Sequence, residues 1–291
     1  MTTVREALHA AVARLDAARI DAPATTARLL LAETLGVGTA WLVAHNDQRL
    51  TTEQQAAFEQ RLRRVVAHEP LAYVLGRRAF FGLDLYVDPR VLIPRQETEL
   101  LVELALTHLR SFPAAQTSFA CVDVGTGSGA VAIAVAAHAP AAQVLATDIS
   151  LAALRVAQLN ARRCGVADRV SFLQADLLSG LATLPPVIVA NLPYVSRAEI
   201  EALPPEIRAH EPRVALDGGA DGLAVVRRLL DQIAEYLARG RGESWRAAFL
   251  EISAAQGEAA LKAAHAALPE VDAAILKDLA KLDRVLALWR T

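Results

Sequence analysis

The sequence predicts an α/β fold in which helices cover both faces of a mostly parallel sheet, preceded by a small all-α domain. Two observations lead to this prediction. From about residue 118 onward, short apolar segments alternate with amphipathic helical segments, which is typical of repeated βα units around a buried parallel sheet. Before that point, residues 1–75 show helical spacing and contain no glycine-rich loop.

The N-terminal domain, residues 1–75, is expected to be a bundle of helices. Val4, Leu8 and Val12 recur at the spacing of one helix face. Glycine and proline residues interrupt the pattern between helices, and the hydroxyl of Thr51 can cap a later one. Because no catalytic cluster lies in this range, we expect it to recognise a partner.

The character of the sequence changes over residues 76–97. Aromatic and β-branched residues alternate there with polar ones around Gly82 and Pro89, a pattern that predicts a β-hairpin linker. Helical spacing returns at Thr98, so the second domain is expected to span residues 98–291.

Strands and helices are expected to alternate through this second domain. The expected strands lie within residues 119–124, 142–149, 169–176, 185–195 and 245–253, and the expected helices within 130–139, 151–165 and 227–240. Parallel sheets of this kind bind ligands beyond the carboxyl ends of their strands. The residues that end each strand are therefore the candidates for function.

The first strand ends in a run of candidate cofactor-binding residues, Asp123, Gly125, Thr126, Gly127, Ser128 and Gly129. The three glycines let the backbone turn sharply and approach a ligand closely, just before a helix begins. Their GxGxG spacing differs from the GxGxxG spacing of dinucleotide sites. The carboxylate of Asp123 would repel a phosphate but suits a ligand that carries an ammonium and a sulfonium. The loop therefore favours S-adenosylmethionine over NAD.

The next two strands also end in carboxylates. Asp148, followed by Ile149, lies 23 positions after Gly125, where a carboxylate can accept hydrogen bonds from both hydroxyls of a ribose. Asp176, followed by Leu177, can accept from an adenine amino group. A helix cap and a solvated loop residue are the respective alternatives. Three candidates in the correct order on successive strands favour the cofactor site.

The fourth strand ends in the predicted catalytic residues Asn191, Leu192, Pro193 and Tyr194. The side-chain carbonyl of Asn191 and the backbone carbonyl of Leu192 can together accept both hydrogens of a planar NH2 group. Tyr194 can stack on that group, and Pro193 stiffens the loop. Since a sulfonium is already an activated leaving group, positioning can carry much of the barrier. The loop predicts methylation of an amide or exocyclic amino nitrogen.

At these residues the chain resembles the HemK/PrmC family, the protein-(glutamine-N5) methyltransferases that act on class 1 peptide-chain release factors. The resemblance covers nearly the whole length and rests on the segments PLAYVLGRRAFFGLDLYVDPRVLIPRQETELLVE, DVGTGSGAVAIA, ATDIS, NLPY and HEPRVALDGGADGL. It implies a Rossmann-like class I S-adenosylmethionine-dependent methyltransferase domain with a mostly parallel seven-stranded sheet. The family usually has NPPY and IPRPETE where this chain has NLPY and IPRQETE.

The resemblance also implies the reaction, in which a methyl group passes from S-adenosylmethionine to the N5 atom of the glutamine in a GGQ motif, leaving S-adenosylhomocysteine. It implies the roles of the site residues: residues 125–129 line the methionine part of the cofactor, Asp148 the ribose, Asp176 and Leu177 the adenine, and residues 191–194 the acceptor glutamine, with Ile149 and Asn191 also at the cofactor. A polar network supporting the site is expected among Arg95, Glu97, Glu99, Glu211 and Arg213.

Three other functions remain open on the sequence: an adenine-N6 methyltransferase acting on RNA or DNA, a non-catalytic cofactor-binding module, and an NAD-dependent oxidoreductase. The chain has 30 Lys and Arg against 32 Asp and Glu, a formal net charge of −2. A near-neutral chain provides no field to hold a polyanion, so stable bulk nucleic-acid binding is not expected. NLPY is also typical of ribosomal RNA adenine dimethylases, which keeps the first alternative in view.

The remaining expectations concern location and cofactors other than S-adenosylmethionine. Cys121 and Cys164 are isolated thiols, which indicates neither a metal site nor a disulfide framework. No signal peptide or bilayer-length apolar stretch is present, so the chain is expected to be cytoplasmic, without membrane contact. We expect a monomer, because no helix shows a sustained exposed apolar stripe.

Overall fold

The computed structural model describes residues 2–110 and 119–290, and the chain divides into two compact units. One unit comprises Met1–Arg77 and Pro204–His210, and the other comprises Arg78–Leu203 and Glu211–Thr291. Each unit has a hydrophobic core of its own. Among the helices of the described residues, none is both long enough and apolar enough to cross a membrane.

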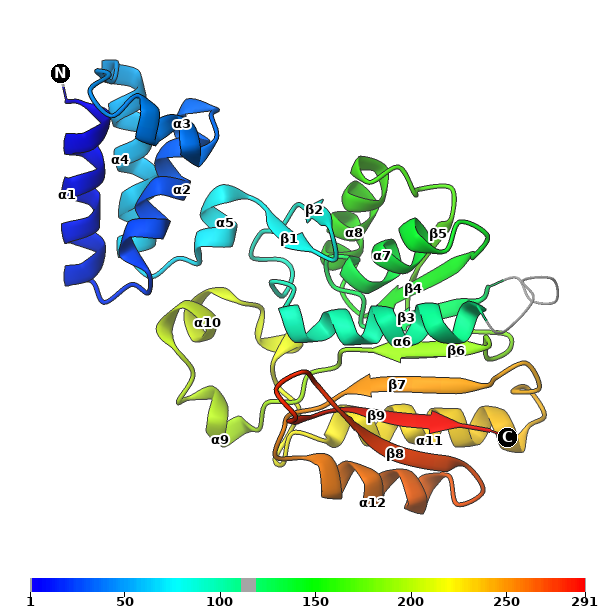
Figure 1. The fold of residues 1–291 in the computed structure, drawn as a ribbon. Coiled ribbons are helices and arrows are strands. Elements are labelled where there is room, and N and C mark those ends of the chain that lie inside the picture. The colour runs from blue at the N-terminus through cyan, green and yellow to red at the C-terminus, as the bar shows by residue number, and fades with distance from the viewer. Residues whose placement is uncertain (1, 111–118, 291) are drawn as a thin grey trace. The chain divides into compact units, whose positions relative to one another are not determined.

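The first unit consists of helices, as the spacing of its apolar residues predicts (Figure 1). They are α1 (Val4–Ala17), α2 (Pro23–Leu35), α3 (Thr39–Ala44), α4 (Thr52–Val66), α5 (Leu71–Leu75) and α10 (Pro205–His210). Helices α1 and α4 each begin with a capping box, in which Thr3 or Thr51 accepts from a backbone N–H of the first turn. Buried aliphatic side chains such as Leu15, Leu30 and Leu62 fill the space between the helices.

The second unit is built on a seven-stranded, mostly parallel sheet, which confirms the predicted fold class. Its strands are β3 (Cys121–Val124), β4 (Val144–Asp148), β5 (Val170–Gln174), β6 (Val187–Ala190), β7 (Ala247–Glu251), β8 (Asp272–Lys277) and β9 (Asp283–Trp289). They lie in the order β5-β4-β3-β6-β7-β9-β8. Strands β3 to β7 are parallel, whereas β9 runs antiparallel to β7 and β8. The strand order reverses beside β3, and a crevice for a ligand is expected at this switch point.

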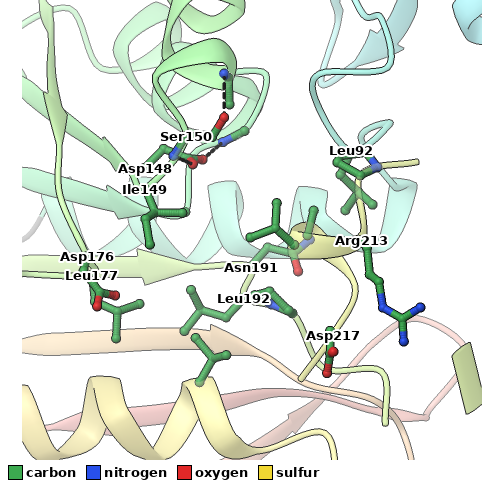
Figure 2. A pocket seen from close by; sticks show the side chains of 18 of the residues that line it. Leu92, Asp148, Ile149, Ser150, Asp176, Leu177, Asn191, Leu192, Arg213 and Asp217 are labelled. Atoms are coloured by element: carbon green, nitrogen blue, oxygen red, sulfur yellow. Dashed lines mark hydrogen bonds between the residues drawn. The ribbon is translucent and has the colours of Figure 1, made fainter. Parts of the chain in front are cut away.

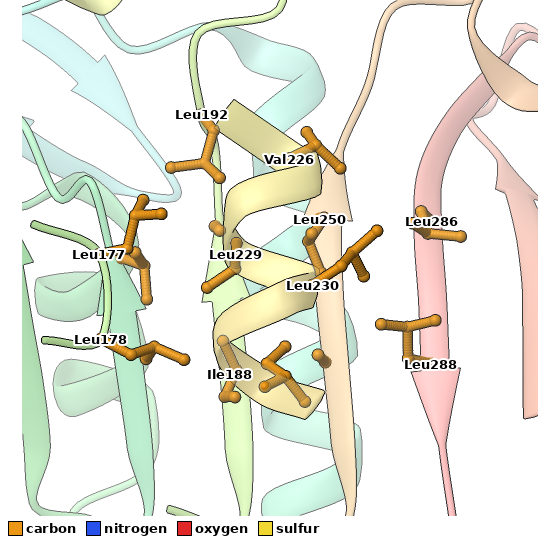
Figure 3. Packing of buried hydrophobic residues seen from close by; sticks show 14 of the residues in the cluster. Leu177, Leu178, Ile188, Leu192, Val226, Leu229, Leu230, Leu250, Leu286 and Leu288 are labelled. Atoms are coloured by element: carbon orange, nitrogen blue, oxygen red, sulfur yellow. The ribbon is translucent and has the colours of Figure 1, made fainter. Parts of the chain in front are cut away.

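Helices cover both faces of this sheet. They are α6 (Glu99–Arg110), α7 (Ala130–His138), α8 (Leu151–Arg163), α11 (Ala224–Ala238) and α12 (Gly257–Ala267), with the short segments η1 (Gln96–Thr98), α9 (Arg197–Ile200) and η2 (Arg213–Ala215) between them. Along β7, Ala247 and Phe249 join the core beneath α6 and α7, whereas Ala248 and Leu250 join the core beneath α11 and α12. Successive strand residues point to opposite faces, so both faces are apolar. Figure 3 shows leucines of α11 packed over β6 and β7.

A β-hairpin precedes the sheet within the second unit. Its strands β1 (Arg78–Phe80) and β2 (Leu83–Leu85) pair antiparallel. Phe81 and Gly82 connect them with φ angles of 48° and 75°, and a two-residue type I′ turn requires positive φ at both positions. The fully buried side chain of Leu85 anchors the hairpin in the core that α6 and α7 cover.

Candidate active site

A cavity of about 620 Å³ opens at the carboxyl ends of β3, β4, β5 and β6 (Figure 2). Predicted residues from all four strand ends line it, namely Gly125, Gly127, Asp148, Ile149, Asp176, Leu177, Asn191, Leu192 and Pro193. The other predicted site residues, Asp123, Thr126, Ser128, Gly129 and Tyr194, are not in its lining. The volume falls within the roughly 300–1,000 Å³ of small-molecule sites. The structure therefore brings most of the predicted residues to one cavity.

Backbone hydrogen bonds join the loop after β3 to the end of β4. The N–H groups of Gly125 and Thr126 both donate to the carbonyl of Thr147, at 2.9 Å each. The N–H of Gly127 donates to Oδ2 of Asp148 at 2.9 Å. These bonds place the glycine loop and the Asp148 carboxylate side by side along one wall of the cavity.

Gly129 and Ser128 hold the same loop against the helices behind it. A Cβ atom at Gly129 would lie 2.7 Å from Cδ1 of Ile133 and 3.0 Å from Cβ of Ala157. Only glycine fits there, because α7 and α8 pack too closely for a side chain. The buried side chain of Asn160 on α8 donates to the carbonyl of Ser128 at 2.9 Å. Sequence reasoning missed Asn160, since an amide inside a helix looks like any polar helix residue.

Asp123 lies beneath the glycine loop, where it does not face the cavity. Its side chain is 2% exposed, and its Oδ2 accepts from the Thr126 hydroxyl at 2.6 Å and from the N–H of Ala132 at 3.1 Å. Burial raises the pKa of this carboxyl to about 6, partly offset by these hydrogen bonds. The alternation of strand β3 explains the placement, because Asp123 points to the same face as Cys121, toward α7. Its carboxylate braces the loop from behind.

Asp148 faces the cavity and is fixed by two backbone donors. Its Oδ2 accepts from Gly127, and its Oδ1 accepts from the N–H of Ser150 at 2.8 Å. Burial raises the pKa of this carboxyl above its usual value, and the hydrogen bonds oppose that shift. An ionised carboxylate has about four lone-pair sites, so it retains capacity for ligand hydroxyls. Ile149, next in the chain, is 55% exposed at the cavity wall.

Asp176 already has a charged partner on α11. Arg228 forms an ion pair with its Oδ2, and both side chains are exposed at the cavity. A ligand amino group would share this carboxylate with the guanidinium. Leu177 adopts a left-handed φ of 57° and is 7% exposed, and its carbonyl accepts from the Thr147 hydroxyl at 3.0 Å. Arg228 was not foreseen, because nothing in the sequence links α11 to the end of β5.

The side-chain amide of Asn191 has a defined orientation. Its Nδ2 donates to Oγ1 of Thr98 at 3.0 Å, and Thr98 is 4% exposed on η1. Because the amide nitrogen is engaged there, the amide oxygen is the end turned away from Thr98. The cavity thus has a carbonyl acceptor beside the backbone of Leu192.

Leu192 belongs to the cavity and to the hydrophobic core at once. Its side chain is 3% exposed and packs in the cluster that contains Leu177 and Val226 (Figure 3). Its Cδ2 would lie 3.2 Å from a Cβ added at Gly125. The leucine therefore fills space under the glycine loop.

The comparisons with known proteins show the family of the chain. Residues 6–76 match the PrmC N-terminal domain family, and residues 102–208 match the family of ribosomal protein L11 methyltransferase (PrmA). A release factor glutamine methyltransferase of Moorella thermoacetica is 41% identical over 289 residues, 99% of both chains. Another, of Caulobacter vibrioides, is 37% identical over 97% of this chain and 95% of that protein. The chain belongs to the release factor glutamine methyltransferase family.

A solved structure supports the fold of this family member independently. The hMettl16 catalytic domain, in complex with the MAT2A 3'UTR hairpin 6, has a TM-score of 0.56 at 17% identity. The match covers 77% of this chain and 81% of that one. At this identity the likeness concerns the fold alone, and it agrees with the class I methyltransferase fold predicted above.

In this methyltransferase, a distant segment of backbone supports the loop after β6. The N–H of Val195 donates to the carbonyl of Leu216 at 3.0 Å, and the N–H of Gly218 donates back to Val195 at 2.9 Å. The side chain of Gln256 donates to the carbonyl of Tyr194 at 2.9 Å. The segment around Gly218, which carried part of the family resemblance, thus has a structural role that the sequence did not reveal.

Tyr194 is not among the residues that line the cavity, and its side chain lies near Glu251 at the end of β7. Burial, and then the charge of Glu251, raise the pKa of its phenol well above the usual range. Glu251 itself is 1% exposed. The structure therefore pairs Tyr194 with a buried carboxylate that sequence reasoning did not single out.

The expected polar network of the methyltransferase is divided into separate contacts. Arg95 pairs with Oε1 of Glu211 at 2.5 Å, and the Glu211 side chain is 1% exposed. Glu99 instead accepts from the N–H of Phe81 in the hairpin at 2.8 Å. Arg213 lines the cavity, and its Nη1 lies 3.8 Å from Oε1 of Glu201, the exposed residue that follows α9. Within this set, Arg95 and Glu211 form the ion pair whose carboxylate is buried, and the Arg95 side chain is 29% exposed.

Proposed function

We propose that this chain transfers a methyl group from S-adenosylmethionine to the N5 side-chain amide nitrogen of a glutamine, that of the GGQ motif in class 1 peptide-chain release factors. The observation that carries the proposal is the fixed amide of Asn191, whose oxygen is left as an acceptor at the cavity. Similarity over 99% of the chain to a release factor glutamine methyltransferase supports the choice of substrate.

The residues present fit S-adenosylmethionine. Gly125 and Gly127 line the cavity with φ angles of 75° and 55° and carry no side chain to obstruct a ligand. Asp148 provides an ionisable carboxylate with unused lone pairs beside them. When bound, the cofactor supplies a methyl group on an electron-poor sulfur. Leu177 and Ile149 provide apolar surface for its base, and Asp176 an acceptor for a ring amino group.

The acceptor glutamine would be bound by the two carbonyls at the end of β6. The Asn191 side-chain oxygen and the Leu192 backbone carbonyl accept one N–H each, which fixes the plane of the amide and raises the electron density on its nitrogen. As the nitrogen–carbon bond forms, the carbon–sulfur bond breaks and its electron pair remains on sulfur. The nitrogen then gives its extra proton to water. Holding the amide in this position lowers the barrier to methyl transfer through proximity and orientation.

The first unit is proposed to recognise the protein partner. It contains the match to the PrmC N-terminal domain family over residues 6–76, and its described helices contribute no residue to the cavity. Because release factors act in translation, we propose that the chain works in the cytoplasm. We also propose that it is a monomer, since the sequence shows no helix with a sustained exposed apolar stripe.

The test is methyl transfer from labelled S-adenosylmethionine to three substrates: a class 1 release factor, the same factor with its GGQ glutamine replaced, and bulk RNA. Label on the unmodified factor alone supports the proposal. Label on RNA would refute it in favour of the adenine-N6 alternative, for which the same NH2-binding loop is suited.

The Asn191→Ala variant tests the site itself. We expect its kcat to fall on the order of 100-fold, comparable to the loss of one group that stabilises a transition state. Cofactor affinity, measured by calorimetry, should fall much less than kcat, because the glycine loop and Asp148 are untouched. Normal turnover by this variant would rule out the acceptor role of Asn191.

A further inference from the structure

Glu251 is a buried carboxylate for which the proposed reaction has no evident use. It ends β7, the strand that pairs with β6. Residues 191–194, which follow β6, form the proposed acceptor loop. It is 1% exposed, and neither of its oxygens accepts a hydrogen bond of standard geometry from any residue that the structure describes. Burying an unpaired carboxylate costs free energy of folding. We therefore expect Glu251 to have a role in function.

Four side chains from three elements determine the electrostatics around Glu251. The hydroxyls of Thr98 and Tyr194 lie near enough to favour the ionised carboxylate, and the guanidinium of Arg284 on β9 attracts it. Glu97, beside Thr98, repels it. Burial outweighs these influences and raises the pKa of Glu251 to about 7. The group therefore changes charge near neutral pH.

Thr98 connects this carboxylate to the acceptor site. Its Oγ1 accepts from Nδ2 of Asn191 at 3.0 Å. A hydroxyl has a single proton, and while the oxygen accepts from Asn191 that proton is free to point to another acceptor. The carboxylate of Glu251 is the charged acceptor beside it.

We propose that Glu251 is a positioning residue for methyl transfer: its carboxylate attracts the nearby Thr98 hydroxyl proton as a hydrogen-bond acceptor, which leaves the Thr98 oxygen available to the Asn191 NH2 group and keeps the amide oxygen toward the acceptor nitrogen. The proposal rests on the proposed function, because it concerns the same acceptor loop. The hydroxyl of Tyr194, at the far end of that loop, also lies near the Glu251 carboxylate.

Protonation of Glu251 weakens this arrangement. A neutral carboxyl group no longer attracts the Thr98 hydroxyl proton as strongly, so that proton is free to turn toward the amide oxygen of Asn191. An Asn191 amide turned over in this way presents its NH2 group to the cavity. It then faces the NH2 group of the acceptor glutamine as a second donor, and the two cannot pair. Turnover is thus expected to decline as the pH falls through about 7.

The experiment compares Glu251→Gln, Thr98→Val, Thr98→Ser and the double variant Glu251→Gln/Thr98→Val in the full chain. At saturating release factor and cofactor, we expect kcat to fall about 10- to 100-fold in Glu251→Gln and in Thr98→Val, the range for a hydrogen bond to a charged group. Thr98→Ser keeps the hydroxyl and should restore most of the rate. The double variant should be no slower than the slower single variant, since both changes break one chain.

The pH profile of kcat separates positioning from a merely structural role. The wild type should show an acidic limb near pH 7, and Glu251→Gln should lack it while its cofactor affinity by calorimetry stays unchanged. An intact limb in Glu251→Gln, or multiplied losses in the double variant, would overturn the proposal. A wild type that labels RNA refutes the proposed function instead, and the same variants measured on RNA still test Glu251.

Discussion

Replacing Gly222 by alanine should distort the acceptor loop without touching the cavity. Gly222 has a φ of 76°, and a Cβ atom there would lie 2.2 Å from the carbonyl oxygen of Tyr194 and 2.3 Å from Nε2 of Gln256. These two atoms are joined by the hydrogen bond that supports the loop, at 2.9 Å. Neither atom is the free end of an unconstrained chain, so the backbone of the loop must shift.

The cost follows from three contributions. A left-handed alanine costs roughly 1–2 kcal/mol, relief of the overpacking roughly 1–3 kcal/mol, and the strained hydrogen bond about 1 kcal/mol. The free energy of unfolding should therefore fall by about 3–6 kcal/mol. For a domain of about 200 residues, each kcal/mol lowers the unfolding midpoint by about 2–4 °C, so a decrease of at least about 6 °C is expected.

Gly240→Ala is the matched control. Gly240 also has a left-handed φ, of 67°, but no described atom lies within 4 Å of where its Cβ would be. It should lose only the strain of roughly 1–2 kcal/mol and keep full methyl transfer. Gly222→Ala should in addition lose on the order of 10-fold in kcat, because a displacement near 1 Å impairs positioning.

The assay combines thermal unfolding of both variants with methyl transfer to the release factor. Equal midpoints for the two variants, together with normal turnover in Gly222→Ala, would refute the idea that the segment containing Gly222 supports the acceptor loop. A stability loss with unchanged kcat would restrict that segment to a role in folding.

Two further predictions concern the carboxylates at the cofactor end. In Asp123→Asn, the pH dependence of stability should change. The pKa of Asp123 is raised to about 6 in the folded state, so the native chain binds more protons than the unfolded chain between about pH 4 and 6, and its free energy of unfolding falls as the pH rises through that window. Urea titrations at pH 4.5 and 7 should show this decline reduced by about 2 kcal/mol in the variant, and an identical decline would contradict the burial argument. Asp148→Asn should weaken S-adenosylmethionine binding about 10- to 100-fold by calorimetry, whereas unchanged affinity would exclude a ribose contact.

The parallel half of the fold could be predicted from sequence because its signals are local. Each apolar strand is followed within a few residues by a helical pattern, and the residues at the strand ends therefore meet at one edge of the sheet. Strands β8 and β9 were not predicted. They form an antiparallel pair with no helix between them. Their short segments mix apolar and polar residues and resemble loops in the sequence, and it is pairing of β9 with β7 that adds them to the sheet.

The site could be predicted only where it depends on such local signals. Asn191 and Asp148 were found because they follow strand ends. The face to which a strand residue points could not be predicted, and Asp123 lies beneath the loop for this reason. The partners of the acceptor loop lie far away in sequence: Thr98 is 93 residues before Asn191, and Gln256 is 62 residues after Tyr194. Such contacts arise from tertiary packing, which no local pattern encodes.

The two walls of the cavity would also form at different times during synthesis. The cofactor wall is drawn from β3, β4 and β5 and the loops that follow them, a continuous stretch that ends near Leu177. The acceptor loop depends on Gly218, Gly222 and Gln256, which leave the ribosome later because chains emerge from the N-terminus first. A nascent chain would thus hold most of the proposed cofactor wall before the loop after β6 has the support of these later residues. Methyl transfer would accordingly require the last third of the chain.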